Sequence, residues 1–198
     1  MAQAIRGNSL YTLVPGTYWE DAEANSVAKG GHLTTINTEA ENLWLYQAFN
    51  INYSMDAANY DGGGSNLANV RLYWTGFTDK DQEGIWKWSS GQAVTYTNWY
   101  SYDGSQPASR EKYLVGTEPN GGTSENYNII GWHNPSWCDI GNGRTDGANL
   151  VGGIAEVSLS LTTTFPTTIK EGSGEFTVNI DLSAGTTSQK LSLIHISE

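Results

Sequence analysis

Two groups of acidic and amide side chains stand out in this chain because each lies in a short segment rich in turn residues. The first is Asp79-x-Asp81-x-Glu83, and the second is Glu118-Pro119-Asn120, which Glu125 and Asp139 follow. Carboxylate and amide oxygens are the ligands that Ca²⁺ takes in proteins. Both groups are therefore candidates for binding a hard divalent cation.

The first group has the acidic spacing of an EF-hand calcium loop, with Gly84 at the sixth position. An EF-hand loop also needs a bidentate Glu at its twelfth position, where this chain has Ser90. In addition, Trp86 and Trp88 indicate a strand where the loop would have to continue. The sequence therefore excludes an EF-hand here.

Acidic residues dominate the charge of the whole chain. Its 198 residues include 21 Asp and Glu against 10 Lys and Arg, which gives a formal net charge of −11. A chain of this charge repels phosphate backbones, so nucleic-acid binding is excluded as its main function. The sequence contains no apolar run of about 18 residues, so we expect no membrane span. Residues 1–7 lack the apolar core of a secretory signal, so we expect any export signal to lie outside this chain.

A single cysteine, Cys138, is present. One cysteine excludes an intrachain disulfide framework and a zinc site of the multi-Cys type. The fold must then be held together by its core, to which 8 Trp, 11 Tyr and 4 Phe contribute large buried anchors.

Helix signals cluster in the first 50 residues. Thr17 and Glu20 have the spacing of a capping box, and so do Thr38 and Glu41. Apolar residues at helical spacing follow each pair, so the sequence predicts two amphipathic helices separated by a short strand over residues 32–36.

Beyond residue 50 the helical period disappears. Turn residues predict long loops over 52–69 and 100–126, and loops of this length in a compact domain are usually functional. Short aromatic or β-branched segments predict strands over 72–77, 85–88, 94–99, 127–132 and 153–161.

Taken in order, these segments resemble the C-type lectin-like domain family over residues 8–158. The resemblance implies an α+β fold in which two helices pack on small antiparallel sheets, with a long calcium-binding loop. The motifs that carry it are Tyr11, Trp19-Glu20-Asp21-Ala22, Gly30-Gly31-His32-Leu33, Glu39, Glu41-Asn42, Trp74-Thr75-Gly76-Phe77, Trp86-x-Trp88 with Gly91, Asn98-Trp99 and Gly153-Ile154-Ala155-Glu156-Val157.

The resemblance also implies a cofactor and a ligand. In the family, Glu-Pro-Asn with a following Glu, and a later Trp-Asn-Asp, bind one Ca²⁺ that coordinates the sugar directly. The matching metal ligands in this chain are Glu118, Asn120, Glu125 and Asp139. The first three of these also contact sugar hydroxyls, and a cis peptide bond precedes Pro119. The Glu-Pro-Asn form implies mannose-type sugars with equatorial vicinal hydroxyls.

The chain departs from the family pattern at Cys138, which takes the place of Asn in Trp-Asn-Asp. A thiol supplies neither a carbonyl oxygen nor an amide donor, and sulfur is a poor ligand for calcium. We therefore expect weakened affinity for both metal and sugar. An alternative register would bring in Asn134 from the preceding turn.

A second ion site is implied at Asp79, Glu83 and Asn126, with Glu125 shared between the two ions. Gly121 stands where the family often has a further carboxylate or amide ligand, which weakens the expectation of a second ion. The alternative for all these polar residues is a solvated loop whose side chains form turns and caps.

The disulfides of animal members are missing, since Ser26 and Ala155 occupy the places of one pair. This absence is typical of members found in large microbial surface proteins. Past residue 158 the composition shifts to Thr, Ser and Gly, with alternating apolar residues from Phe176 to Leu182. We expect residues 159–190 to begin a truncated β domain that resembles a Calx-beta repeat over 167–181, and residues 191–198 to be a non-native tail.

These observations predict a non-catalytic, calcium-dependent carbohydrate-binding module of a larger extracellular or cell-surface adhesion protein. The main alternative is a degenerate lectin-like module that mediates protein–protein adhesion without sugar binding. An enzyme is disfavoured, because the formylglycine-generating oxidases of this fold need paired cysteines and the chain has no Ser-His-Asp order.

Overall fold

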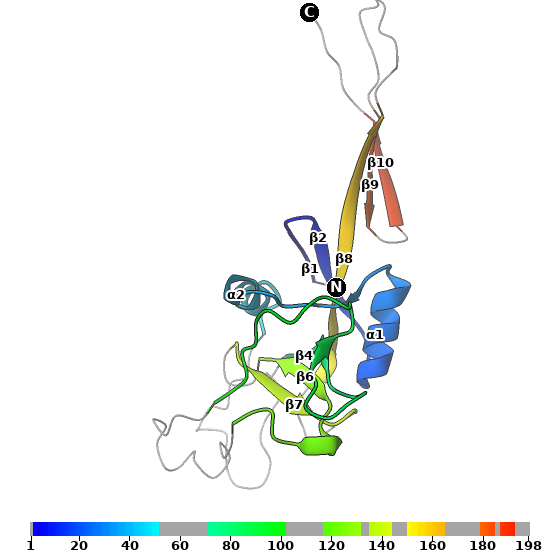
Figure 1. Ribbon diagram of the computed structural model, residues 1–198. Helices are drawn as coiled ribbons and strands as arrows, with labels where there is room; N and C mark the ends of the chain where they lie inside the picture. Colours follow the sequence, from blue (N-terminus) through cyan, green and yellow to red (C-terminus); the bar gives the residue numbers. More distant parts are fainter. Residues whose placement is uncertain are drawn as a thin grey trace, which may run out of the picture.

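The computed structural model describes residues 2–51, 71–101, 117–131, 135–143, 150–164, 179–184 and 187–192 (Figure 1). These residues contain two α-helices, a short 3₁₀ turn over Gly122–Ser124 and ten strands. The helices are α1 (Trp19–Ala28) and α2 (Glu39–Ala48). The strands are β1 (Gln3–Arg6), β2 (Ser9–Val14), β3 (His32–Leu33), β4 (Leu72–Thr78), β5 (Lys87–Trp88), β6 (Tyr127–Ile130), β7 (Trp137–Ile140), β8 (Leu150–Thr164), β9 (Asn179–Ala184) and β10 (Thr187–Ser192).

The strands form a mixed sheet in the order β1-β2-β8-β4-β6-β7, which confirms the predicted α+β class. Strand β8 pairs antiparallel with β2 and parallel with β4, whereas antiparallel sheets alone were predicted. Parallel neighbours need a long connection between them, and the chain between β4 and β8 supplies it.

Helix α2 begins as its sequence predicts. Thr38 is the N-cap, and its hydroxyl oxygen accepts a hydrogen bond from the Glu41 backbone N–H at 3.2 Å. Glu41 in turn accepts from the backbone N–H of Asn37 at 2.9 Å. These bonds satisfy backbone donors that the first helical turn would otherwise leave free.

The predicted capping box of α1 is wrong. The N-cap is Tyr18, whose side chain makes no capping bond, and the Trp19 backbone N–H donates instead to Oδ1 of Asn142 at 2.8 Å. Glu20 accepts hydrogen bonds from the side chains of Tyr127 and Asn142. A partner distant in sequence therefore replaces the local cap, Thr17, that the spacing suggested.

Some of the other strand predictions are confirmed and one is wrong. Residues 72–77, 127–132 and 153–161 correspond to β4, β6 and β8, but only Lys87 and Trp88 form a strand within 85–88. The prediction for 94–99 is wrong, because its pairing is a single bridge from Trp99 to Trp137. Strand β7 and the edge strand β1 had no predicted counterpart. The predicted loop over 52–69 lies outside the described residues.

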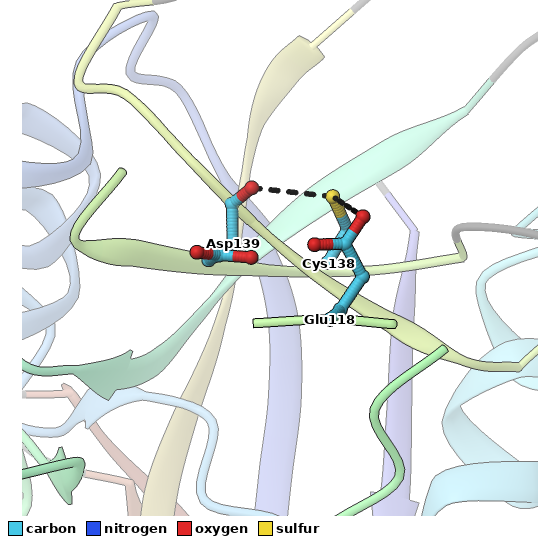
Figure 2. Close-up of side chains that lie close together, drawn as sticks. All are labelled: Glu118, Cys138 and Asp139. Atoms are coloured by element: carbon cyan, nitrogen blue, oxygen red, sulfur yellow. Dashed lines mark hydrogen bonds between the residues drawn. The ribbon is translucent and has the colours of Figure 1, made fainter. Parts of the chain in front are cut away.

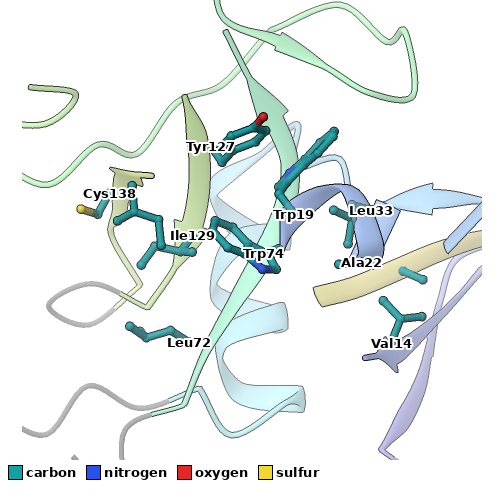
Figure 3. Close-up of a cluster of buried hydrophobic side chains, with 11 residues drawn as sticks. Val14, Trp19, Ala22, Leu33, Leu72, Trp74, Tyr127, Ile129 and Cys138 are labelled. Atoms are coloured by element: carbon teal, nitrogen blue, oxygen red, sulfur yellow. The ribbon is translucent and has the colours of Figure 1, made fainter. Parts of the chain in front are cut away.

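Two clusters of buried apolar side chains form the core. In the first, the rings of Trp19 and Trp74 pack against Tyr127, with centroid separations of 5.2 and 6.2 Å (Figure 3). The second is built around Phe77, whose ring lies 4.4 Å from that of Trp88. Burying a large apolar side chain contributes about 1.5–3 kcal/mol. This aromatic packing stabilises a domain whose sequence allows no intrachain disulfide.

Strand β8 changes partners within its length. It pairs with β2 as far as Ser158, and from Leu159 onward it pairs with β9 (Figure 1). Strand β10 extends this second group and includes Leu191 and Ser192, the first two residues of the expected tail. Most of the Calx-beta-like segment, including 171–178, lies outside the described residues. The domain boundaries at 158 and 190 stay predictions.

Candidate functional site

The site lies where the segment after Thr117 meets strand β7. The backbone N–H of Glu118 donates to the Tyr100 carbonyl at 2.9 Å, and the Tyr100 N–H donates to the Trp137 carbonyl at 2.9 Å. The segment around Tyr100 thus lies between Glu118 and the start of β7. This backbone ladder brings Glu118 beside Cys138 and Asp139, about twenty residues later in the chain.

A cis peptide bond joins Glu118 to Pro119, as the family resemblance implied. Glu118 is half-buried and Asn120, two residues later, is exposed. Nδ2 of Asn120 donates to Oε2 of Glu118 at 2.6 Å, so the amide and the carboxylate lie side by side. Both polar groups are therefore next to each other at a position that solvent reaches.

Asp139 holds the loop that follows Pro119. Its side chain is only 2% exposed, and its carboxylate accepts from the backbone N–H of Asn120 at 3.1 Å and from that of Gly121 at 3.0 Å. Hydrogen bonds to an ionised acceptor are stronger than those between neutral groups. Asp139 is therefore an anchor for the loop as well as a candidate metal ligand.

Glu118, Cys138 and Asp139 each offer a ligand atom, and these three atoms lie within 4.8 Å of one another (Figure 2). The Cys138 thiol faces two acceptors, Oε1 of Glu118 at 3.4 Å and the backbone carbonyl of Asp139 at 3.2 Å. Sulfur thus lies among the oxygens, at the position where the family pattern has an amide.

The electrostatics of the cluster follow from crowding acidic groups in a partly buried place. Burial, together with the neighbouring Asp139, raises the pKa of Glu118 to about 8. Burial and the charges of Glu118 and Asp139 also raise the pKa of the Cys138 thiol. Both groups therefore hold their protons at neutral pH, and a bound cation would shift both pKa values downward.

Glu125 folds back over Gly121, just after the 3₁₀ turn. A Cβ built on Gly121 would lie 2.2 Å from Cβ and Oε2 of Glu125, so the absence of a side chain at Gly121 makes room for this carboxylate. The charge of Glu125 also contributes to the raised pKa of Glu118, which places the two groups in one neighbourhood. The Glu125 side chain therefore fills the space that a side chain at position 121 would take.

The second predicted ion site contains two buried oxygens without a hydrogen-bond partner among the described residues, Oδ1 of Asp79 and Oδ1 of Asn126. The two residues are adjacent, since the Asp79 N–H donates to the Asn126 carbonyl at 3.3 Å. Glu83 is exposed, and partial desolvation with the charges of Asp79 and Asp139 raises its pKa. Unpartnered buried oxygens are costly, and a hard cation would satisfy them.

Two contributions to the site could not be recognised from residue types. Tyr100 acts through its backbone, and Gly121 acts through the space that it leaves. The alternative ligand Asn134 lies outside the described residues.

Comparison with known proteins places this arrangement in a family. The profile of the Lectin C-type domain matches residues 16–126, which is more than half of the chain. The chain belongs to the C-type lectin domain family. This family comprises carbohydrate-binding lectins, and its members are binding modules rather than enzymes. Its relatives are mostly secreted or cell-surface proteins, and calcium binding is general in the family although some members are calcium-independent.

Relatives of this C-type lectin domain include a perlucin-like protein from Mytilus galloprovincialis, which is 29% identical over 86 residues, covering 43% of this chain and 46% of the relative. C-type lectin domain family 4 member K from Homo sapiens is 32% identical over 85 residues, covering 42% of this chain and 20% of the relative. The match thus spans less than half the length of either relative.

Solved structures share the fold of this C-type lectin domain. The carbohydrate-recognition domain of the mouse scavenger receptor C-type lectin aligns with a TM-score of 0.53 at 20% identity, covering 79% of this chain and 94% of that one. The cow C-type carbohydrate-recognition domain of CD23 aligns with a TM-score of 0.50 at 23% identity, covering 78% and 92%. In the part of this lectin chain that the structure describes, no helix is long and apolar enough to cross a bilayer.

Proposed function

We propose that this domain binds glycans reversibly through Ca²⁺ held by Glu118, Asn120, Glu125 and Asp139. The observation that carries the proposal is the convergence of the Glu118 and Asp139 carboxylates, with the exposed Asn120 amide beside them. Calcium takes 6–8 oxygen ligands, and these side chains with sugar hydroxyls supply that chemistry. Membership of a carbohydrate-binding family supports the same conclusion.

The sugar-contacting residues in this proposal are Glu118, Asn120 and Glu125. A carboxylate accepts a hydrogen bond from a sugar hydroxyl, while the Asn120 Nδ2 donates one to it. Adjacent acceptor and donor groups suit two vicinal hydroxyls, and Glu-Pro-Asn favours the equatorial, mannose-type arrangement. The Asn120–Glu118 hydrogen bond of 2.6 Å is the contact that a bound sugar would exchange for its own.

A second calcium ion is part of the proposal. Asp79, Glu83 and Asn126 would hold it, with Glu125 shared between the two ions. The unpartnered buried oxygens of Asp79 and Asn126 support this assignment, because an oxygen that lacks a hydrogen bond is available as a ligand. This ion would brace the loop that carries Glu125.

Cys138 lowers the expected affinity of the first site. Its sulfur takes the place of the amide oxygen that would complete the calcium shell in the family pattern. The residue is buried, with an exposed fraction of 4%. Calcium prefers hard oxygen ligands over sulfur. We therefore expect calcium and sugar binding to be weak, in a range that needs millimolar concentrations of both.

Titration calorimetry with methyl α-mannoside tests the proposal, in millimolar calcium and in EDTA. Heat that requires calcium and disappears in Glu118→Gln supports it. Glu39→Gln is the matched control, because it makes the same substitution at an exposed position on α2. The absence of heat at millimolar sugar and calcium, in wild type and in Cys138→Asn alike, would refute sugar binding at this site.

The second candidate function is adhesion to a protein partner without sugar recognition, and the buried Cys138 thiol among the candidate metal ligands favours it. The Cys138→Asn variant separates the two functions. If it gains calcium and sugar binding that wild type lacks, the natural site is degenerate. In both cases we propose that the domain works outside the cell or at its surface, within a larger adhesion protein.

A further inference from the structure

A second cluster of carboxyl groups lies apart from the lectin site, where α2 meets the sheet. The hydroxyl oxygen of Tyr11, on β2, lies 2.8 Å from Oε1 of Glu41, on α2, and 3.1 Å from Oε1 of Glu156, on β8. Ser9, also on β2, places its hydroxyl 3.0 Å from the same Glu156 oxygen. We name Glu41, Tyr11 and Glu156 the bridged carboxyl pair.

The remaining oxygen of each carboxyl group is already an acceptor. Oε2 of Glu156 accepts from the Thr35 backbone N–H at 3.2 Å, and Oε2 of Glu41 accepts from the Asn37 backbone N–H at 2.9 Å. An N–H can only donate, so neither of these two oxygens can carry a proton toward its partner. A proton that links the two carboxyl groups must therefore lie on the side of Tyr11.

Counting hydrogens shows that the bridged carboxyl pair is one proton short when both glutamates are ionised. The three contacts of Tyr11 and Ser9 with the carboxylates need three hydrogens, but each hydroxyl supplies only one. The single Tyr11 hydrogen would then have to serve both carboxylates in a three-centre contact. A proton on Glu156 removes the conflict, because Glu156 donates to Tyr11 and Tyr11 donates to Glu41.

The surroundings offer little positive charge to replace that proton. His32, on β3, pairs with Glu156 in strand register, but its Nδ1 lies 2.6 Å from Glu23 of α1. Arg6, on β1, lies over the Trp44 ring of α2, 5.5 Å from its centroid. Within the described residues, no ion pair joins a cation to Glu41 or Glu156.

We propose that the bridged carboxyl pair holds one shared proton and that this proton links α2 to the sheet. Glu41 belongs to α2, and Tyr11 and Glu156 belong to adjacent strands β2 and β8, so the shared proton links three elements. Burial raises the pKa of Glu156 above its ordinary value, although the hydrogen bonds from Thr35, Ser9 and Tyr11 act in the opposite direction. A carboxyl group with a raised pKa stabilises the fold at low pH, and the contribution is lost as the pH rises through the raised value.

A glutamine at position 41 would supply the missing hydrogen permanently. Its amide oxygen can accept from Asn37, its Nε2–H can donate to Tyr11, and Tyr11 can then donate to an ionised Glu156. The variant Glu41→Gln should therefore become more stable relative to wild type as the pH rises, because it keeps its hydrogen while the wild-type pair loses its proton. At the low-pH end of the range, where the proposed proton is held, the two proteins should have the same melting temperature.

The test is thermal unfolding in EDTA from pH 5 to pH 8, with Glu39→Gln as the control for removing one charge from α2. We expect Glu41→Gln to raise the melting temperature by about 2–4 °C at pH 8 and to leave it unchanged at pH 5. Glu118, whose raised pKa acts with the same sign, is present in all three proteins and cancels in the comparison. A lower melting temperature for Glu41→Gln at both pH values would overturn the proposal.

Infrared spectroscopy gives an independent readout of the proton itself. At pH 6.5 in EDTA, wild type should show a neutral carboxyl band that Glu156→Gln removes, whereas Glu118→Gln should remove a different one. If Glu156→Gln leaves the neutral carboxyl bands unchanged, the shared proton does not exist. A different result would show that the pair binds a cation and that the proton assignment is wrong. In that case, calcium would raise the melting temperature at pH 8, lowering the pH would not raise it, and Glu41→Gln would abolish the effect of calcium.

Discussion

Replacing Asp139 by Ala should destabilise the domain even when no calcium is present. The carboxylate of Asp139 accepts from the backbone N–H groups of Asn120 and Gly121 at 3.0–3.1 Å, and the residue is 2% exposed. These two donors lie in an irregular loop, so no strand or helix partner replaces the carboxylate when it is removed. The loss therefore tests whether Asp139, which we propose as a metal ligand, is also a structural anchor.

The magnitude follows from the two backbone donors. A hydrogen bond to a charged group contributes about 1.5–3 kcal/mol, so two such bonds contribute about 3–6 kcal/mol. We therefore expect a loss at the lower end of this range, near 3 kcal/mol. Asp139→Asn keeps one side-chain oxygen for the same donors and should cost about 1–2 kcal/mol.

Urea unfolding in EDTA, followed by tryptophan fluorescence, measures these differences. Glu118→Gln is the control, because its carboxyl group is already largely protonated at neutral pH and its replacement should change the unfolding free energy little. A loss below about 1 kcal/mol for Asp139→Ala would show that water replaces the carboxylate at the loop. The anchor described here would then be refuted, independently of any effect on calcium.

Three further predictions concern the site and the helix beside it. Because the pKa of Glu118 is about 8 without calcium, calcium binding must displace the proton of this carboxyl group. The apparent calcium affinity, measured by competition with a chromophoric chelator, should therefore rise about tenfold per pH unit up to pH 8 and then level off. Gly121→Ala should weaken calcium binding, because the new methyl group displaces Glu125. Gly122 has open space around it but a φ of 51°, so Gly122→Ala should lower the unfolding free energy by about 1 kcal/mol and leave the calcium affinity unchanged. Equal calcium affinities of the two variants would contradict this prediction. Asn142→Ala removes the hydrogen-bond acceptor at the start of α1 and should lower the free energy of unfolding in urea by about 1 kcal/mol. No change in this free energy would show that water caps the helix instead.

How far the sequence predicted the fold depended on the distance between interacting residues. Helix α2 was predictable because Thr38 and Glu41 cap it within one turn. The start of α1 was not, because its acceptor, Asn142, is more than a hundred residues away. The segment 94–99 has the composition of a strand, yet it pairs only through Trp99, since strand pairing depends on neighbours that composition does not specify.

The candidate site divides in the same way. The family motif located Glu118 and Asp139, and the structure brings their ligand atoms together. The motif did not show that Asp139 holds the backbone of the loop, or that Gly121 makes room for Glu125. Both depend on the path of the backbone after Pro119, and a pattern of residue types carries no information about that path.

Strand β8 has a mechanical consequence. It lies between β2 and β4 in the sheet and continues past Ser158 as the strand that pairs with β9. A pulling force applied to β8 from its β9-paired end acts parallel to the strand. It therefore shears the hydrogen bonds on both edges of β8 at the same time, instead of breaking them one after another. Tension on a tethered, ligand-bound domain would thus be borne by the interior of its sheet.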